Sequence, residues 1–154
     1  IALVRELDPT RKVLVTDSGN LGLWAGAYKR GDSFGTSVYI YLWNEDTGPL
    51  RTILPPETYL VKRKLMELAY GPKETFLIEL SAEPWLNKPI VETDLETQFS
   101  RMDPQKFEEI IRYARRTRLP QQYLWGAEWW YWLKETHNEP AMWERARVLY
   151  QSGS

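Results

Sequence analysis

The chain has 154 residues, enough for one domain with a sizeable core but short of the ~250 residues of a complete eight-unit α/β barrel. Its 20 Lys and Arg against 21 Asp and Glu give no electrostatic case for nucleic acid or for an anionic membrane, and no apolar run reaches the ~20 residues of a membrane span. The absence of Cys excludes disulfides and thiolate metal sites, and a single His137 argues against a His-based metal cluster or a Ser-His triad. We therefore expect no metal or other cofactor, and these counts leave the cellular compartment open.

Strands and helices are expected to alternate four times along the chain. IALVREL, at residues 1–7, is typical of the end of an amphipathic helix entered midway, which indicates that an earlier part of the protein is missing. Apolar, β-branched and aromatic runs predict strands at 12–16, 33–43, 74–80 and 122–126. The helices that follow are expected at 21–30, from about Pro55-Pro56 to Gly71-Pro72, at 105–118 and at 139–150.

This alternation predicts an α/β fold with a parallel sheet covered by helices. Doubly wound sheets and barrels both fit, but no Gly-rich phosphate loop follows any strand, which argues against a nucleotide-binding doubly wound fold. Polar and aromatic residues collect after the strands instead, as on the active-site face of a barrel. We expect residues 1–150 to form about the last four βα units of a (β/α)8 TIM barrel, with a flexible tail at 151–154. The collected residues are Asp17 and those at 39–44, 79–85 and 125–132.

The aromatic content is high, with 8 Trp and 9 Tyr. Flat, partly polar rings are suited to stacking on sugar faces while an N–H or O–H makes hydrogen bonds. A large aromatic core or a protein interface explains the composition equally well.

Four segments resemble, in order, the second half of the clan A glycoside hydrolases, which include the family 5 cellulases. RELDPTRKVLV resembles the segment that closes helix four and enters strand five. GTSVY at 35–39 is similar to the end of strand six, where a His-x-Tyr places a tyrosine beside the nucleophile. FLIEL at 76–80 resembles strand seven, which ends in the nucleophilic Glu. YLWGAEWW resembles strand eight, whose terminal Trp lies under the sugar.

The resemblance implies a retaining hydrolase of β-linked oligo- or polysaccharides. Glu79 matches the nucleophile, Tyr39 its hydrogen-bonding tyrosine and Trp125 the sugar platform. Ser37 stands where the family has His, a departure that bears on subfamily and substrate. The acid/base Glu of the family ends strand four, upstream of Ile1, so the 154-residue chain by itself is expected to be inactive and to need the N-terminal half of the barrel.

Each of the candidate carboxylates, Glu79, Glu83 and Asp17, also has an interpretation other than a role in the site. Glu79 ends an apolar strand, where an ionised group is costly unless functional or paired, so a buried ion pair or an exposed position is the competing interpretation. Glu83, in SAEPW, is an alternative nucleophile or a ligand of a sugar hydroxyl, and equally a surface carboxylate. Asp17 can reach a substrate hydroxyl or cap the following helix.

Further subsite candidates follow strand ends, and several aromatic residues are expected to pack instead. The candidates are Trp43, Trp85, Glu128 and Trp129. Assigned to packing are Trp24, Trp130, Trp132 and Trp143, and His137 is expected to be structural or exposed.

The triplet Asn138-Glu139-Pro140 resembles the strand-four end of these hydrolases, where its Glu is the acid/base. It follows no predicted strand, and Asn at a cap with Pro in the first turn is ordinary helix initiation. We therefore expect it to be structural.

Two non-catalytic hypotheses stand beside the hydrolase. A half-barrel has open strand edges and uncovered apolar surface, which favour pairing with a second copy of the chain. A barrel-derived protein could also bind carbohydrate through its Trp and Tyr residues without hydrolysing it.

Overall fold

Four strands form one parallel sheet, in the order β1-β2-β5-β6. These strands are β1 (Leu14–Asp17), β2 (Ser33–Val38), β5 (Thr75–Ser81) and β6 (Gln121–Trp125). Neighbours in the sheet follow the order of the chain, and the sheet lacks the reversal of strand order that marks a doubly wound fold. The predicted α/β class with a parallel sheet is confirmed.

The computed structural model describes residues 1–152, which divide into two compact units. The first comprises residues 1–39, 53–80 and 113–123, and the second comprises 40–52, 81–112 and the described residues from 124 onward. The sheet belongs to the first unit except for the last residues of β5 and β6. Each unit has its own core and is described separately.

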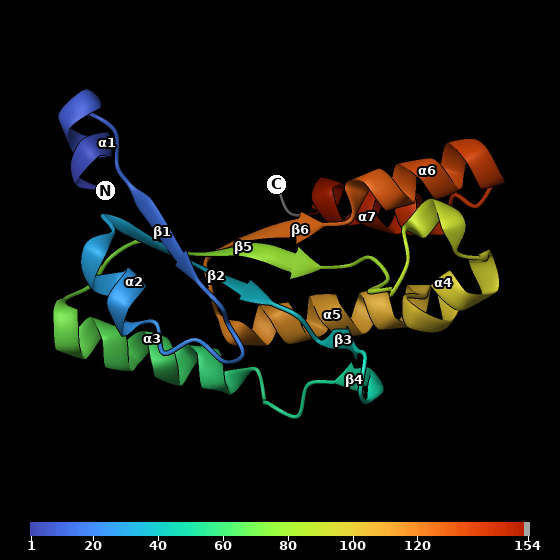
Figure 1. Cartoon of the computed structure of the whole chain (residues 1–154), viewed down its shortest axis with the longest axis horizontal. Coiled ribbons are helices and arrows are strands. Elements are labelled where there is room, and N and C mark those ends of the chain that lie inside the picture. The colour runs from blue at the N-terminus through green and yellow to red at the C-terminus, as the bar shows by residue number, and fades with distance from the viewer. Residues whose placement is uncertain (153–154) are drawn as a thin grey trace. The chain divides into compact units, whose positions relative to one another are not determined.

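Helices cover one face of the sheet in the first unit. Besides α1 (Ala2–Leu7), this unit contains α2 (Ala25–Arg30), α3 (Glu57–Tyr70) and the end of α5 (Pro104–Thr117), and α2 and α3 lie on the same side of the sheet (Figure 1). Their core is aromatic, since Trp24 packs on Phe34 and Tyr59 with all three side chains fully buried. The packing role that the sequence predicted for Trp24 is therefore confirmed.

The opposite face of the sheet is uncovered in this unit. Paired positions of parallel strands face the same side, and the pairs Leu14–Ser33, Thr16–Gly35 and Gly35–Phe76 define this face. On this face Leu14 is 43% and Tyr123 is 54% exposed. They line an open hollow of 540 Å³ together with Phe76 and Ile78. An apolar sheet face in contact with solvent is unusual for a parallel sheet, which is normally covered on both faces.

The β2–β5 register shifts by one residue between Thr36 and Ser37. Thr36 pairs with Leu77, but Ser37 pairs with Glu79, so Ile78 is an extra residue of the kind that forms a β-bulge. The burial of β5 follows this shift, because Leu77 and Leu80 are buried on the helix side while Ile78 and Glu79 are both half-buried. Glu79 consequently shares the uncovered face with Ser37.

The second unit consists of a hairpin and short helices. Its antiparallel hairpin pairs β3 (Tyr41–Asn44) with β4 (Gly48–Arg51). The helical segments are η1 (Ile90–Glu92), α4 (Leu95–Arg101), the first part of α5, α6 (Ala127–His137) and α7 (Ala141–Ser152). Trp129 and Trp130 of α6 form much of the core, where Trp130 meets Phe107 edge-on and Trp129 packs near Phe99.

Several predicted boundaries were wrong. The run 33–43 is two strands, β2 and β3, because the chain leaves the sheet after Val38 to enter the hairpin. The expected loop after β5 contains η1 and α4. The expected tail includes residues 151–152 of α7, while 153–154 lie outside the described residues.

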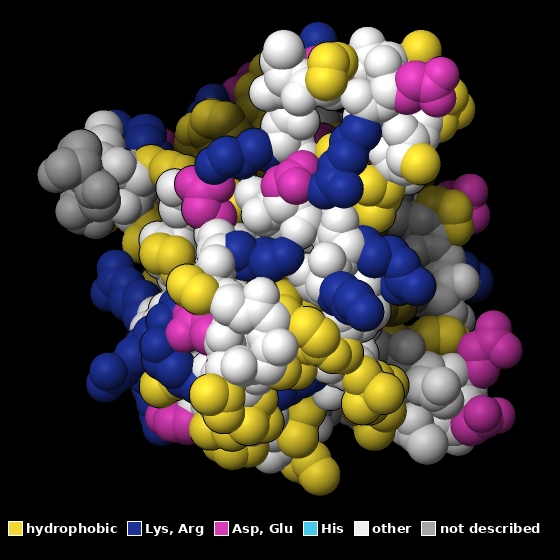
Figure 2. Space-filling view, turned by 90° about the vertical axis from the view of Figure 1, so that its left-hand side faces the viewer, with side chains coloured by type: hydrophobic (Ala, Val, Ile, Leu, Met, Phe, Trp, Pro, Cys, Tyr) yellow, Lys and Arg dark blue, Asp and Glu magenta, His cyan; other side chains and the backbone are white. Residues whose placement is uncertain are grey.

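Hydrophobic side chains reach the surface of the face seen in Figure 2, with Lys and Arg side chains among them. The exposed apolar residues include Leu3, Val4 and Leu7 of α1 and Leu65 and Leu68 of α3. None of the helices within residues 1–152 combines the length and the apolar character needed to cross a membrane.

Candidate functional site

Tyr39 and Glu79 meet at the carboxyl ends of two neighbouring parallel strands. Tyr39 directly follows β2, and its hydroxyl donates a hydrogen bond to Oε2 of Glu79 in β5. Ser37 is the register partner of Glu79 and is buried. The carboxylate therefore has a tyrosine donor and lies on the sheet face that no helix of its unit covers.

The loop after β1 holds the end of β2 in place. The Gly19 amide donates to Oγ of Ser37 at 3.4 Å, and Nδ2 of Asn20 donates to the Tyr39 carbonyl at 3.0 Å. Oδ1 of Asn20 in turn accepts from the Tyr59 hydroxyl at 2.6 Å. Gly19 is required for this approach, because a Cβ at this position would stand 1.7 Å from the Ser37 carbonyl oxygen. The loop thereby fixes the backbone that carries Tyr39.

Asp17 stabilises this loop but does not cap α2, because no side chain makes a cap hydrogen bond at the start of that helix. Its carboxylate accepts from the backbone amides of Ser18 at 2.8 Å and Trp24 at 2.9 Å. Lys62 of α3 supports the same loop by donating to the carbonyls of Gly19 and Gly22. Burial lowers the pKa of Lys62, while the charge of Asp17 opposes that shift. The expectation that Asp17 binds a substrate hydroxyl is not needed to explain its position.

Trp125 and Glu83 form a second pair, in the second unit. The indole Nε1 of Trp125 donates to Oε1 of Glu83 at 2.8 Å, and the Trp125 side chain is 51% exposed. Burial raises the pKa of Glu83, the Trp125 hydrogen bond opposes this, and the charge of Glu128 adds to it. Trp125 thus offers an accessible ring with its edge fixed, as a sugar platform needs. Glu128 is exposed in the first turn of α6.

The prediction that Trp129 belongs to a substrate subsite was wrong. It is 2% exposed, and its Nε1 donates to Oε1 of the buried Gln98 at 2.7 Å. Neither ring face is available to a sugar, because helix α6 turns this side chain into the core. The expected packing of Trp130 is confirmed, since its Nε1 donates to the Ala82 carbonyl at 2.9 Å.

The remaining aromatic residues of this region pack at or near the surface. Trp132 and His137 contact each other edge to face with centroids 4.3 Å apart, and Trp143 packs on Tyr131. Both contacts agree with the packing roles expected from the sequence.

The triplet 138–140 lies between α6 and α7 and follows no strand, as predicted, but Asn138 was given the wrong role. It is the C-cap of α6 in a left-handed conformation, with φ of 55°. The Glu139 amide donates to the Leu133 carbonyl at 3.1 Å, and the Glu139 side chain is exposed. The triplet closes one helix before the next begins.

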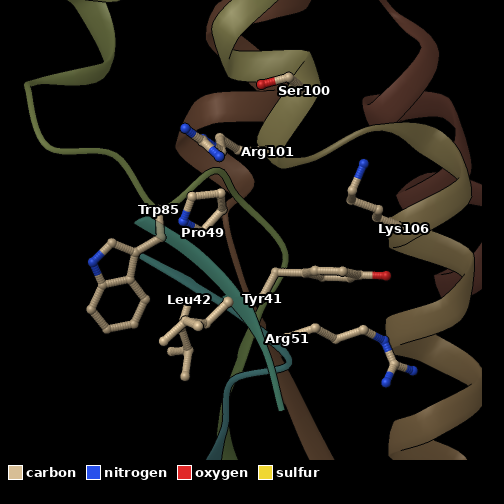
Figure 3. Close-up of a pocket in the computed structure, with 9 residues that line it drawn as sticks. Tyr41, Leu42, Pro49, Arg51, Trp85, Ser100, Arg101 and Lys106 are labelled. Atoms are coloured by element: carbon tan, nitrogen blue, oxygen red, sulfur yellow. The ribbon is translucent and has the colours of Figure 1, made fainter. Parts of the chain in front are cut away.

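Trp85 and the hairpin form a small pocket in the second unit (Figure 3). The pocket has a volume of 170 Å³, and Trp85 at its edge is 42% exposed. Trp43 is a half-buried residue of β3 and is not part of the lining. The lining residues are Tyr41, Leu42, Pro49, Leu50, Arg51, Trp85, Ser100, Arg101 and Lys106.

The hairpin wall of this pocket is fixed by Glu109 of α5. Its carboxylate accepts from the Tyr41 hydroxyl and from the Arg51 guanidinium. These two contacts lower the pKa of Glu109, while burial first and the Glu109 contact second raise the pKa of Tyr41 to about 12. The sequence predicted Trp85 as a subsite residue but not the rest of this pocket, because residues 41–51 were assigned to a strand and a loop. The cationic lining residues Arg51, Arg101 and Lys106 are not connected by any local sequence motif.

Comparison with protein-family models, with curated proteins and with solved structures found no match for this chain. Within residues 1–152 no three His, Asp or Glu side chains are grouped so that they could hold a metal ion. What the structure shows of the class of this protein is its fold, an α/β arrangement with a parallel four-stranded sheet.

Proposed function

We propose that this chain is the C-terminal half of a retaining glycoside hydrolase, a clan A barrel resembling the family 5 cellulases. In this proposal Glu79 is the nucleophile, Tyr39 positions and stabilises its carboxylate, and Trp125 is the sugar platform. The acid/base carboxylate comes from the half of the barrel that precedes Ile1. The four βα units correspond to strands five to eight.

The observation that carries this proposal is the Tyr39–Glu79 hydrogen bond at the carboxyl ends of β2 and β5. The resemblance implies this contact between residues that are far apart in sequence, and composition alone does not require it. The order of the parallel strands and the uncovered sheet face also support the proposal, since a barrel has a single helical layer outside and its catalytic residues at the carboxyl ends of the strands.

The test is covalent trapping with the complete natural gene product. Activated 2-deoxy-2-fluoro-β-glycosides of glucose, mannose and xylose leave a stable glycosyl ester on the nucleophile of a retaining enzyme. We expect peptide mapping to place the ester on Glu79 and the Glu79→Gln variant to remain unlabelled. Glu139→Gln is the matched control and should be labelled as the unmodified protein is. An ester on Glu83 would overturn the assignment of Glu79, and no ester with any glycoside would overturn the hydrolase.

The second candidate is a non-catalytic half-barrel that pairs with another copy or binds carbohydrate. The uncovered apolar face lined by Leu14, Phe76, Ile78 and Tyr123 favours it, because such a surface gains free energy when it is removed from water. Light scattering of the 154-residue chain during size exclusion separates the two forms of this candidate. A dimer supports pairing, and a stable monomer counts against it.

A further inference from the structure

We propose that the pocket between the β3–β4 hairpin, Trp85 and the helices α4 and α5 binds a uronic acid residue of a glycan. The choice of a sugar as the ligand rests on the proposed function. The requirement for an anion comes from the lining of the pocket itself.

The polar lining is cationic. Arg51, Arg101 and Lys106 line the pocket, and no Asp or Glu is among the lining residues that the structure describes. Glu109 compensates Arg51, and Asp103 accepts from Lys106 at 2.6 Å. These carboxylates therefore neutralise two of the three cations.

Arg101 supplies the uncompensated charge. At the end of α4, its guanidinium forms no ion pair with the residues within 1–152. The Lys106 ammonium has three N–H groups, of which Asp103 takes one. Arg101 and Lys106 therefore both keep N–H groups that are not taken by a carboxylate of this unit. The planar guanidinium also matches the geometry of a carboxylate better than a point charge does.

The rest of the lining fits the ring of a sugar. The Trp85 indole lies at one side of the opening, and Tyr41 and Pro49 contribute further flat or apolar surface (Figure 3). An aromatic face can cover the C–H groups of a pyranose while polar groups bind its substituents. The volume of 170 Å³ corresponds to roughly six waters at about 30 Å³ each, which suits one sugar ring and not a long oligosaccharide.

Calorimetric titration of the complete natural gene product tests this proposal. The probes are glucuronate and galacturonate, with glucose as the neutral ring and acetate as the carboxylate without a ring. We expect at least one uronate to bind at least ~10-fold more tightly than both glucose and acetate, since one good charged hydrogen bond contributes about 1.5–3 kcal/mol. Equal affinity for the uronates and glucose would show that charge is not recognised, and equal affinity for acetate would show that the ring is not. Absence of uronate binding also overturns the proposal.

Two variants locate the binding. Arg101→Gln should weaken uronate binding ~10-fold or more, and Trp85→Ala should also weaken uronate binding. Both variants should keep the unfolding temperature of the parent chain. Arg115→Gln is the matched control, because Arg115 is exposed in the last turn of α5 and outside the pocket. If Arg101→Gln and Arg115→Gln bind equally well, the site is elsewhere and the proposal fails.

The result is separable from the hydrolase proposal. Glu79→Gln should bind uronate with unchanged affinity, because Glu79 is not part of the lining. Uronate binding with no covalent ester on any residue would overturn the hydrolase alone. An ester on Glu79 without uronate binding would overturn only the pocket's assignment.

Discussion

The Tyr39 hydroxyl donates a hydrogen bond to the Glu79 carboxylate across the β2–β5 pair, although the two residues are 40 positions apart. Tyr39→Phe removes that hydrogen bond and keeps the ring. We expect ester formation on Glu79 to slow by ~10- to 100-fold, because a hydrogen bond to a charged group contributes about 1.5–3 kcal/mol. The rate is measured with the activated fluoroglycosides and the complete gene product. Tyr131→Phe, an exposed position of α6, is the control. Equal rates for the two variants would remove Tyr39 from the site.

Trp125 and Trp129 are expected to separate binding from stability. Trp129→Ala should destabilise the chain by about 3–5 kcal/mol, because it empties a core site and leaves Gln98 without its indole partner. Trp125→Ala should cost less than about 1 kcal/mol and should abolish binding of oligosaccharide at that platform. Urea unfolding and calorimetric titration check the two effects. A large loss of stability in Trp125→Ala would show that this ring is structural.

Glu83 should make the stability depend on pH. Its pKa is raised in the folded protein, chiefly by burial, so the folded state binds this proton more tightly than the unfolded chain does. The resulting contribution is fully present below the unfolded value of about 4.3 and is lost as pH rises through the folded pKa. Glu83→Gln should therefore raise the unfolding temperature at pH 7 by about 1–3 °C and have little effect near pH 4.

Glu92→Gln is the control for that comparison, since Glu92 is an exposed carboxylate of the same unit. Thermal unfolding at both pH values gives the difference. A lower unfolding temperature of Glu83→Gln at pH 7 would mean that the ionised carboxylate is stabilising, in conflict with its raised pKa.

Gly19→Ala should destabilise the chain by about 2–4 kcal/mol, because the new methyl group meets the backbone carbonyl of Ser37 and not a movable side chain. It should also slow ester formation on Glu79, since the loop anchors the Tyr39 backbone through Asn20. Gly26→Ala in α2 is the matched substitution and should be neutral or stabilising by up to ~1 kcal/mol. Chemical unfolding of both variants checks the contrast, and similar stabilities would contradict it.

The sheet was predictable because its strands are continuous apolar runs separated by helices. Phe34 and Leu77 lie in runs that only a buried strand or helix explains, and Gly71-Pro72 marks the end of α3 unambiguously. The break after Val38 was not predictable in the same way. Ile40 and Tyr41 have high β propensity, and the local pattern continues a strand although the chain leaves the sheet to form the hairpin.

The predicted site residues also differ in how well the sequence located them. Tyr39 and Glu79 were placed from a resemblance that included strand order, and the structure brings them together. Trp125 ends β6 and Trp129 lies in the first turn of α6, and although both look alike in sequence, the first ring is accessible and the second is buried. The cationic pocket has no sequence signal, since Arg51, Arg101 and Lys106 come from three different elements.

The extra residue in β5 decides which environment Glu79 occupies. Side chains of a regular strand alternate, so with Ile78 on the solvent-accessible side its successor would point beneath the helices, among Phe34 and Leu77. A carboxylate there would have to become neutral or disrupt the core. One added residue inverts the alternation of side chains from that point in β5. Glu79 therefore lies on the face of the sheet that the helices of its unit do not cover. The face of the sheet on which the side chain of residue 79 lies is therefore decided by the number of residues in β5 and not by the identity of that side chain.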